Sequence, residues 1–529
     1  MRSSWYLLST PRSECMAASV LLLMSLWLTG CEVDPTRQMA EKFSTVRDPQ
    51  QHAPDNHWST WKPTSSRKEL VADLKTTTII PDGNRLVQAH KSYQLDEIID
   101  LGLKANPQTR SAWENARAAA SGVGIAEAYW LPVLSASMLG GYWQYPFPGA
   151  GSAFSLKGTS VNPTLSLSWT LFDMARKSRI EIADQALFSS NFTLNRTHQQ
   201  IAFDIQKTFY QLLAAKSRVE ASEINLKQAT TIAEAITRKL EQGLATKPEA
   251  LMAIQDQAKA GYELQSAQGQ VWQKEAELAE HVGITPNAGL QTIGMKDLPL
   301  PEAMEGSADM VIDRALEGRP DLAAKLAEVR AKDAAIRKSE ATFWPTFQIT
   351  GEAGYKVWNY QNANGGAANQ NVSISEPVLS SFLTMNWNIF EGFAGVNAID
   401  QAKAQQKSAE AEFQTLQLRI IRDVWKAYAD LKTSTRKREF ALAMLKAADQ
   451  SYAAAMQSYD QGVATCMELL TAERNLAAAR YTEIDSKANV LEAAAALVFA
   501  SGQRTETAGD PRSGIPDLGS SPIAAQTLP

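Results

Sequence analysis

Cysteine, histidine and excess basic charge are all scarce in this chain of 529 residues. Its 3 cysteines cannot form a disulfide framework, and its 5 histidines are scattered without the spacing of metal ligands. The 52 Lys and Arg against 57 Asp and Glu give a net charge of −5, so the basic footprint of a nucleic-acid-binding protein is missing. The composition therefore predicts no metal site, no cofactor and no nucleic-acid partner.

Long apolar runs are also missing beyond the N-terminus. No stretch of 18 uncharged apolar residues follows residue 31, so any later passage through a membrane must use strands. The 44% hydrophobic and 21% charged fractions are those of ordinary water-soluble proteins, which argues against a polytopic helical membrane protein.

The N-terminus has the layout of a secretory signal. Arg2 and Arg12 precede the apolar run from Met16 to Leu28, which is too short for a permanent transmembrane helix. The sequence Leu28-Thr29-Gly30-Cys31 resembles the lipobox of bacterial lipoproteins. That resemblance implies removal of residues 1–30 and attachment of lipid to Cys31; an ordinary signal with a chance cysteine is the alternative. Residues 31–91 are rich in proline and predict a lipidated extended arm, and residues 504–529 predict a disordered tail.

Between these ends the sequence is duplicated. A shift of 213 places Asp100, Pro107 and Glu127 on Asp313, Pro320 and Glu340 without a gap. A shift of 219 places the motif of residues 242–249 on that of residues 461–468. We therefore expect one structural unit used twice, at 92–284 and 305–503, with a linker at 285–304.

Each unit contains two segments in which apolar and polar residues alternate. The clearest run has Leu165, Leu167, Trp169 and Leu171 between small polar residues. We expect strands at about 133–145, 161–172, 346–358 and 380–390. Alternation over about ten residues is typical of outer-membrane strands, although a half-buried strand of a soluble sandwich has the same period.

Four membrane strands cannot close on themselves, and an open edge is not tolerated in hydrocarbon. If these strands lie in a membrane, several chains must together form one barrel, which has four strands for each chain. Eight strands would leave a filled interior, whereas twelve would leave a channel.

Most of the remaining sequence follows a heptad pattern. Apolar or small residues recur in steps of four and three from Ile201 to Leu240. The same pattern returns after the shift of 219, where only Arg438 breaks it. A helix from about Ala175 to Leu240 would be roughly 100 Å long at 1.5 Å per residue. The chain is therefore predicted to be mainly α, with long coiled-coil helices and a small β part.

Each long helix is expected to end at a helical hairpin tip, at 242–249 and 461–468. Gly243 and Gly462 suit the left-handed position that ends a helix. Thr246 with Glu249, and Thr465 with Glu468, form T-x-x-E capping boxes that begin the next helix. Two interpretations of the glutamates stand side by side, as helix caps and as charges on a docking and gating surface.

No enzyme motif is convincing. Gly122-x-Gly124-x-x-Glu127 departs from a dinucleotide-binding motif at its last position and follows no strand. Cys466 has no nearby histidine in sequence, so it is interpreted as a tolerated small residue, which would be oxidisable if its thiol were exposed. The chain is predicted not to be an enzyme.

Taken together, the lipobox, the duplicated Trp-Leu-Pro and Trp-Pro sequences before a strand, and the Gln-Gly-(Leu/Val)-Ala-Thr-x-x-Glu tip motifs carry a family resemblance. The chain resembles the TolC-type outer membrane factors, the outer membrane efflux protein family, in the lipoprotein branch that serves resistance-nodulation-division (RND) pumps. The resemblance implies a homotrimer whose chains complete a 12-stranded barrel in the outer membrane. A helical tunnel would extend into the periplasm, lipid-anchored and without a cofactor.

The resemblance further implies a passive duct that exports drugs and other toxic small molecules, opened by a periplasmic adaptor and an inner-membrane RND pump. The candidate docking and gating residues at the tips are Gly243, Ala245, Thr246, Glu249, Tyr459, Gly462, Ala464, Thr465 and Glu468. Ala464 stands where some members have arginine, so an arginine lock cannot be carried over. A type I secretion duct for polypeptides and a periplasmic coiled-coil scaffold without a barrel are the alternatives.

Overall fold

The computed structural model describes residues 82–88, 91–147, 154–295, 307–363 and 371–502, together with Leu298 and Leu300. Residues 1–30, Cys31 and the tail at 504–529 lie outside the described residues, as does the arm up to residue 81. The chain divides into two compact units. A strand unit contains residues 120–170 and 349–382, and a helical unit contains the described residues of 57–119, 171–348 and 383–529.

The helices dominate, and each half of the chain has a set of four. The first set is α4 (Leu95–Ala105), α5 (Pro107–Glu127), α6 (Ala175–Glu241) and α7 (Lys247–Val282). The second is α8 (Ala308–Gly318), α9 (Pro320–Glu340), α10 (Ala394–Asp460) and α11 (Cys466–Ala500). Short 3-10 turns lie at Asp82–Leu86, Ala128–Trp130, Pro286–Ala288 and Ala341–Phe343. None of the helices described is long and apolar enough to cross a bilayer.

The two sets of helices are related by the same shifts in residue number as the duplicated sequence. The shift of 213 carries both ends of α4 and α5 onto those of α8 and α9, and the shift of 219 carries both ends of α6 onto those of α10. A long-range contact recurs at equivalent places: Trp169 Nε1 donates to the carbonyl of Trp130, and Trp387 Nε1 to that of Phe343, both at 3.0 Å. The second half therefore repeats local packing as well as helix length.

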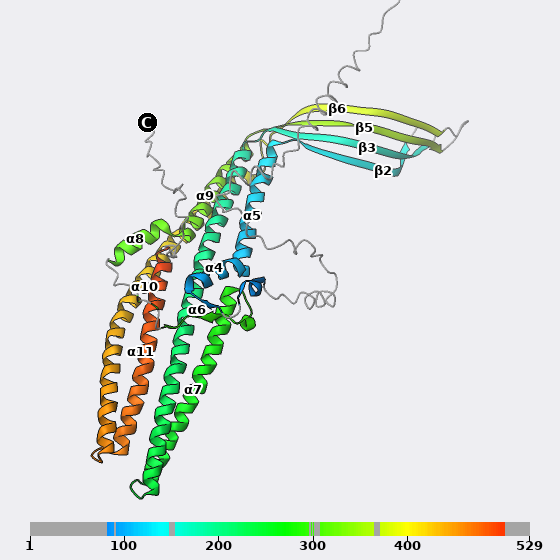
Figure 1. Cartoon of the computed structure of the whole chain (residues 1–529). Coiled ribbons are helices and arrows are strands. Elements are labelled where there is room, and N and C mark those ends of the chain that lie inside the picture. The colour runs from blue at the N-terminus through cyan, green and yellow to red at the C-terminus, as the bar shows by residue number, and fades with distance from the viewer. Residues whose placement is uncertain are drawn as a thin grey trace, which may run out of the picture. The chain divides into compact units, whose positions relative to one another are not determined.

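Two long helical hairpins form most of the helical unit. Figure 1 shows α6 beside α7 and α10 beside α11, and the two hairpins are joined mainly where α11 packs on α6. Helix α6 spans the helix that the heptad pattern predicts and is one residue longer. At 67 residues each, α6 and α10 are about 100 Å long. The short β1 (Ser92–Tyr93) and β4 (Gln291–Thr292) pair in parallel, and Lys216 of α6 donates to the Thr292 hydroxyl at 3.2 Å.

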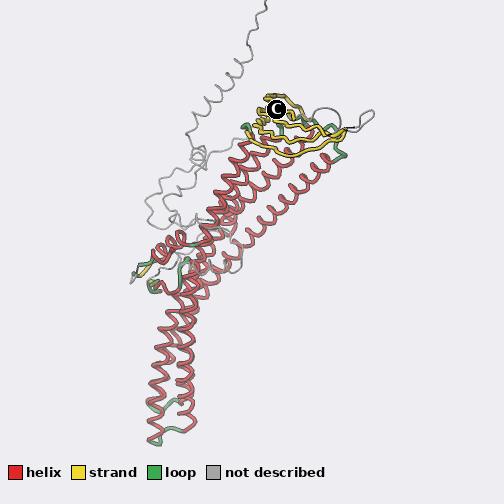
Figure 2. Tube along the Cα trace, turned by 90° about the vertical axis from the view of Figure 1, so that its right-hand side faces the viewer, coloured by secondary structure: helices red, strands yellow, loops and turns green. Residues whose placement is uncertain are grey.

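The strand unit contains one four-stranded sheet, drawn in yellow in Figure 2. Its strands are β2 (Val133–Phe147), β3 (Phe154–Phe172), β5 (Thr346–Ala363) and β6 (Asn371–Asn386), in the order β2-β3-β5-β6. β2 and β3 are antiparallel, from Val133 opposite Ser168 to Phe147 opposite Phe154. Strands β2 and β6 are the outer strands, and neither has a second neighbour among the described residues.

The predicted strand bounds were too short at the ends toward the connecting segments, and one strand was predicted to run too far at its other end. β3 begins at Phe154 rather than at about 161, β5 continues to Ala363 rather than 358, and β6 begins at Asn371 rather than at about 380. The segments between the predicted strands of each pair are rich in Gly and Asn, yet parts of them extend the strands, because hydrogen bonding to a neighbouring strand outweighs their low strand propensity. β6 also ends at Asn386 rather than at about 390.

The register of β2 and β3 sorts their side chains by chemistry. Residues paired across an antiparallel ladder share a face, so Leu134 and Leu167 lie on one face with Ala136 and Leu165. The opposite face carries Ser135 against Ser166, whose hydroxyls are 2.8 Å apart, and Ser137 against Thr164. Several apolar side chains of the first face are exposed in the single chain; examples are Leu134 (54%), Met138 (74%) and Tyr142 (65%).

Candidate functional site

Both predicted capping boxes are present at the hairpin tips. The backbone N–H of Thr246 donates to Glu249 at 2.7 Å, and that of Thr465 donates to Glu468 at 2.8 Å. The hydrogen bond from the Thr246 N–H, with a second from its hydroxyl, lowers the pKa of Glu249. Gly243 and Gly462 both have φ of +74°, the left-handed conformation expected where each long helix ends.

The tips of the two hairpins pack on a shared hydrophobic cluster, here called the tip cluster. Tyr459 and Ala245 pack against its edge, and the Lys239 ammonium lies 3.9 Å from the centre of the Tyr459 ring. Of the candidate tip residues, Tyr459 thus reaches the neighbouring hairpin, whereas the hydrogen bonds of Thr246, Glu249, Thr465 and Glu468 stay within their own caps. The buried residues of the tip cluster are Ile232, Ala233, Ile236, Ala250, Ala253, Cys466, Leu469 and Leu470.

Cys466 is part of this cluster and is not an exposed thiol. Its exposed fraction is 3%, and burial, followed by the nearby Glu249 and Asp256, raises its pKa. A buried neutral thiol is a poor nucleophile. The interpretation as a small packing residue therefore holds, and the concern about ready oxidation does not.

Above the tip cluster the interior of the helical unit becomes polar. Sequence reasoning missed these residues, here called the polar layer: Ser222, Asn225, Asp256, Glu473, Arg474, Arg480 and Tyr481. The layer separates the tip cluster from a second apolar cluster around Phe209 and Ile205. The heptad pattern contained one signal, Ser222, and extending that pattern to α7 and α11 would have found Asp256 and Glu473.

The polar layer joins α6, α7 and α11 through specific hydrogen bonds. Arg474 donates to both carboxylate oxygens of Asp256, with Nε 3.0 and 3.1 Å from them. Arg480 donates to Asn225 at 2.7 Å and to Gln228 at 2.8 Å. The hydroxyls of Ser222 and Tyr481 are 2.9 Å apart. Two hairpins that are far apart in sequence are therefore held in one register.

Glu473 is the exception within this layer. Its exposed fraction is 6%, yet no hydrogen bond or ion pair to it is found among the residues the structure describes. Burial raises the pKa of Glu473 to about 7, with Asp256 as the next largest cause. A carboxyl that titrates near neutrality therefore lies inside the hairpin interface.

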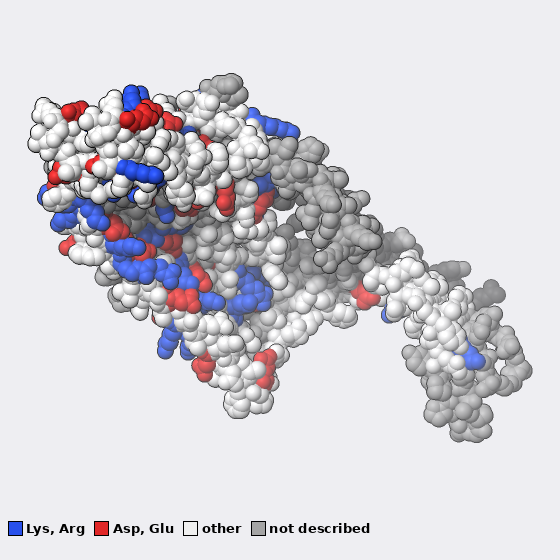
Figure 3. All heavy atoms as spheres, turned by 90° about the horizontal axis from the view of Figure 1, so that it is seen from below, with Lys and Arg blue, Asp and Glu red and all other residues white. Residues whose placement is uncertain are grey.

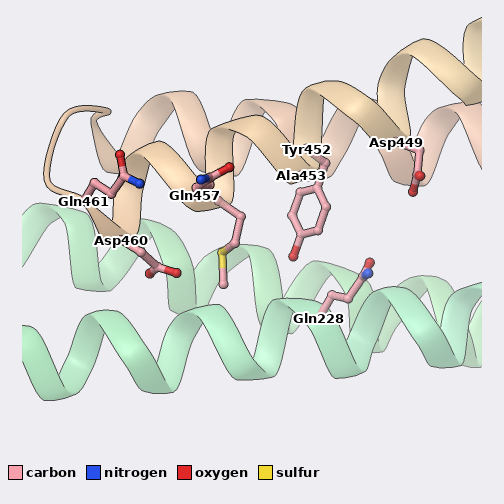
Figure 4. A pocket seen from close by; sticks show the side chains of 8 residues that line it. Gln228, Asp449, Tyr452, Ala453, Gln457, Asp460 and Gln461 are labelled. Atoms are coloured by element: carbon pink, nitrogen blue, oxygen red, sulfur yellow. The ribbon is translucent and has the colours of Figure 1, made fainter.

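An open groove lies beside the polar layer. Its volume is about 550 Å³, and it is lined by Gln228, Asp449, Tyr452, Ala453, Met456, Gln457, Asp460 and Gln461. Figure 4 shows Tyr452 and Asp449 of α10 pointing toward α6, with Gln228 of α6 pointing back. The groove thus separates α6 from α10 over the last turns before the second tip.

Charge on the helical unit is mixed in sign. Figure 3 shows Lys and Arg interspersed with Asp and Glu on the face seen from below. Arg438, which breaks the heptad pattern, pairs with Glu483 at 3.2 Å. No cluster of three or more metal-binding side chains occurs in the described ranges.

The comparisons with known proteins agree with this architecture. Residues 98–283 and 311–503 match the family described as outer membrane efflux protein. The chain is 27% identical over 425 residues to protein CyaE of Bordetella pertussis, covering 78% of this chain and 85% of that protein. It is 23% identical over 505 residues to the pyoverdine export outer membrane protein OpmQ of Pseudomonas putida, covering 94% and 98%.

Solved structures show the same fold. The CmeC outer membrane channel of Campylobacter jejuni superposes with a TM-score of 0.66 at 17% identity, covering 86% of this chain and 91% of that chain. Because the family match extends over both sets of helices and strands, the resemblance inferred from the sequence is confirmed. The chain belongs to the outer membrane efflux protein family.

Proposed function

We propose that this protein is the outer-membrane duct of a tripartite efflux system, through which small toxic molecules leave the cell passively. The observation that carries this proposal is the four-stranded sheet with open edges at β2 and β6, in which the pairs Leu134–Leu167 and Ala136–Leu165 lie on one face of β2 and β3 and the pairs Ser135–Ser166 and Ser137–Thr164 on the other. Lipid outside and water inside require that division of side chains.

The open edges favour assembly with further copies of the chain. Unpaired backbone groups are costly in hydrocarbon, and four strands are too few to close. A homotrimer would supply twelve strands, enough for a water-filled barrel, as expected for this family. Exposed aromatic side chains on α7 and α10 favour the same assembly: Tyr262 (76%), Trp272 (71%), Trp425 (56%) and Phe440 (74%).

The hairpin tips are the proposed docking and gating surface. Leu244 and Val463, at 74% and 80% exposure, extend from the turns beside Gly243 and Gly462 and are available to a periplasmic adaptor protein. The adaptor would connect the duct to an inner-membrane RND pump, which supplies the energy. The duct itself needs neither catalysis nor a cofactor.

The remaining expectations complete the proposal. Residues 1–30 are a signal peptide, Cys31 carries the lipid, and residues 31–91 form the arm in the periplasm. Residues 92–284 and 305–503 are the two structural repeats, joined by the linker at 285–304, and 504–529 is a tail. The name of the relative OpmQ, a pyoverdine exporter, supports a small-molecule cargo.

Planar-bilayer recording of the purified full-length protein tests the duct. We expect a trimer by light scattering and a steady conductance. A monomer without conductance, fully soluble after removal of detergent, would instead support the coiled-coil scaffold. In a deletion strain we expect increased drug sensitivity with unchanged polypeptide export; the opposite pattern would identify a secretion duct.

Cross-linking tests the docking surface. Leu244→Cys and Val463→Cys place reactive thiols at the two tips, and Leu418→Cys is a matched control because Leu418 is also exposed (68%) but lies far along α10 from the tip. We expect adaptor adducts with the two tip variants only. Equal adducts with Leu418→Cys would contradict docking at the tips.

A further inference from the structure

The polar layer contradicts the pattern of the chain's own repeat. Under the shift of 219, the position equivalent to Glu473 is Ile254 in α7, and the position equivalent to Asn225 is Met444 in α10. Ile254 and Met444 are 47% and 44% exposed, whereas Glu473 and Asn225 are 6% and 2% exposed. Polar side chains are thus buried here where the other half carries apolar side chains at the surface, so ordinary core packing does not account for them.

The charges around Glu473 balance without it. Helix α7 contributes Asp256 and Glu263, and α11 contributes Arg474 and Arg480; Glu263 also lies 3.8 Å from the largely exposed Lys259. The carboxylates of Asp256 and Glu263 thus have cationic neighbours, whereas an ionised Glu473 would be a buried negative charge without a hydrogen bond or ion pair of its own among the described residues. Burying an unpaired charge is unfavourable, so the closed layer favours the neutral acid of Glu473 over its carboxylate.

Among the described residues, the charged groups that shift the pKa of Glu473 all belong to α7 and α11, and none to α6 or α10. Helix α10 contributes Tyr452, whose pKa is raised by burial and then by Glu473. Helix α6 contributes the neutral amides of Asn225 and Gln228, both acceptors for Arg480. The Nδ2 of Asn225 is buried without a hydrogen-bond partner. A single proton on Glu473 is therefore the change that completes the charge balance of the layer.

The groove gives water access to this layer. Gln228 and Tyr452 line the groove and also adjoin the polar layer, one through Arg480 and the other beside Glu473. Figure 4 shows both side chains between α6 and α10. Protons can therefore exchange with the layer while the two hairpins remain packed together.

We propose that the polar layer is a proton-operated latch between the two helical hairpins: with a proton on Glu473 the hairpins are held together, and its loss favours their separation. This inference rests on the proposed function, because separation of the hairpins would widen the periplasmic end of the duct. The tip cluster, which is apolar, holds the hairpins together at any pH. The latch therefore shifts the equilibrium between packed and separated hairpins and does not determine it alone.

The direction of the pH dependence follows from where Glu473 titrates. Its pKa is about 7 in the packed layer against 4.5 when exposed to water. The packed form therefore has its full advantage below pH 4.5 and loses it as the pH rises to about 7. The ratio of packed to separated hairpins is expected to fall by up to about 10²-fold across that range.

Hydrogen–deuterium exchange of the full-length protein in lipid nanodiscs tests the latch between pH 5 and pH 8, with rates corrected for intrinsic exchange. We expect protection of residues 222–232 and 470–480 to fall as the pH rises in the wild type. Glu473→Gln removes the titration and keeps the shape, so its protection should remain high and independent of pH. Glu223→Gln, an exposed change at the same level of α6, should behave as the wild type does.

Glu473→Met is a second variant without a titratable group, in case the amide disturbs assembly. A pH response that persists in either Glu473 variant, or one that is absent from the wild type, would overturn the latch. Conductance recorded on the same samples separates the two proposals. A protection change that depends on Glu473, without conductance in any variant, would support the latch and overturn the duct.

Discussion

The two long helices α6 and α10 have the same length and the same heptad spacing, yet they are buried very differently. Helix α6 contacts four helices, α4, α7, α9 and α11, and besides its heptad positions it buries a second row of residues that includes Phe209, Leu213 and Ile232. Helix α10 contacts three helices, α8, α9 and α11, and most of its buried residues are positions of the heptad pattern. The heptad pattern thus determines which face of each helix packs against a neighbour. The number of neighbouring helices determines how many residues outside that face are also buried.

That contrast makes the exposed side of α10 informative. Trp425 and Phe440 are large apolar residues on a surface that no helix of the same chain covers among those described. Exposed aromatic residues in such a row mark surfaces for association. The less buried of the two helices is therefore the one that needs a partner, in agreement with the proposed trimer.

The largest expected effect comes from truncating equivalent aromatic residues in the two helices. Phe209 has an exposed fraction of 0% in α6, and Tyr428, the equivalent residue of α10, is only partly buried. Phe209→Ala should cost about 3–5 kcal/mol because it leaves a cavity, and Tyr428→Ala should cost clearly less. Denaturant melts of the two purified variants measure the difference. Equal losses would mean that assembly buries α10 as deeply as α6.

A smaller effect is expected at two equivalent glycines that end the return helices. Gly283 and Gly502 have φ of +81° and +73°, and a Cβ on either would clash, with Asn106 at 2.8 Å and with Arg319 at 2.7 Å. Because a backbone atom of Asn106 cannot move aside as a side-chain atom of Arg319 can, Gly283→Ala should cost more than Gly502→Ala. We expect about 2–4 and 1–3 kcal/mol. The same melts rank them, and the reverse order would contradict this account.

One ion pair interrupts the heptad pattern of α10, and its two residues can be replaced by the residues at the equivalent positions of the first half. Arg438 pairs with Glu483, whereas the equivalent positions in the first half are Val219 and Leu264. Arg438→Val alone should destabilise by about 1–2 kcal/mol because it leaves a mostly buried carboxylate unpaired. Adding Glu483→Leu should restore stability to within about 0.5 kcal/mol or raise it. If the double variant were no more stable than Arg438→Val alone, the ion pair would have a role beyond compensating charge.

The smallest effects are expected at the caps, where the halves are alike. Thr246→Ala and Thr465→Ala should each cost about 1 kcal/mol, because each removes one cap of an exposed hairpin tip. Hydrogen exchange in the first turns of α7 and α11 should increase to a similar extent. A much larger effect at Thr465 would indicate that its cap also stabilises the neighbouring tip cluster.

Local features of the molecule could be predicted well from the sequence. The bounds of α6, the glycine turns and both capping boxes depend on residues within a few positions of one another. The strand ends could not be predicted in the same way, because the Gly- and Asn-rich segments extend β3, β5 and β6 only through pairing with their neighbours. The polar layer escaped notice because its partners come from opposite halves of the chain, as with Arg474 and Asp256.

The sequence by itself determined the repeating period, the helix ends and the alternation of the strands, since each follows from contacts between residues close along the chain. Only the tertiary structure decided that Cys466 is buried, that α6 is central, and that Glu473 is buried between two hairpins, where burial raises its pKa. The physical reason is that burial depends on which distant helices cover a surface. Equal patterns in the two halves therefore acquired unequal environments.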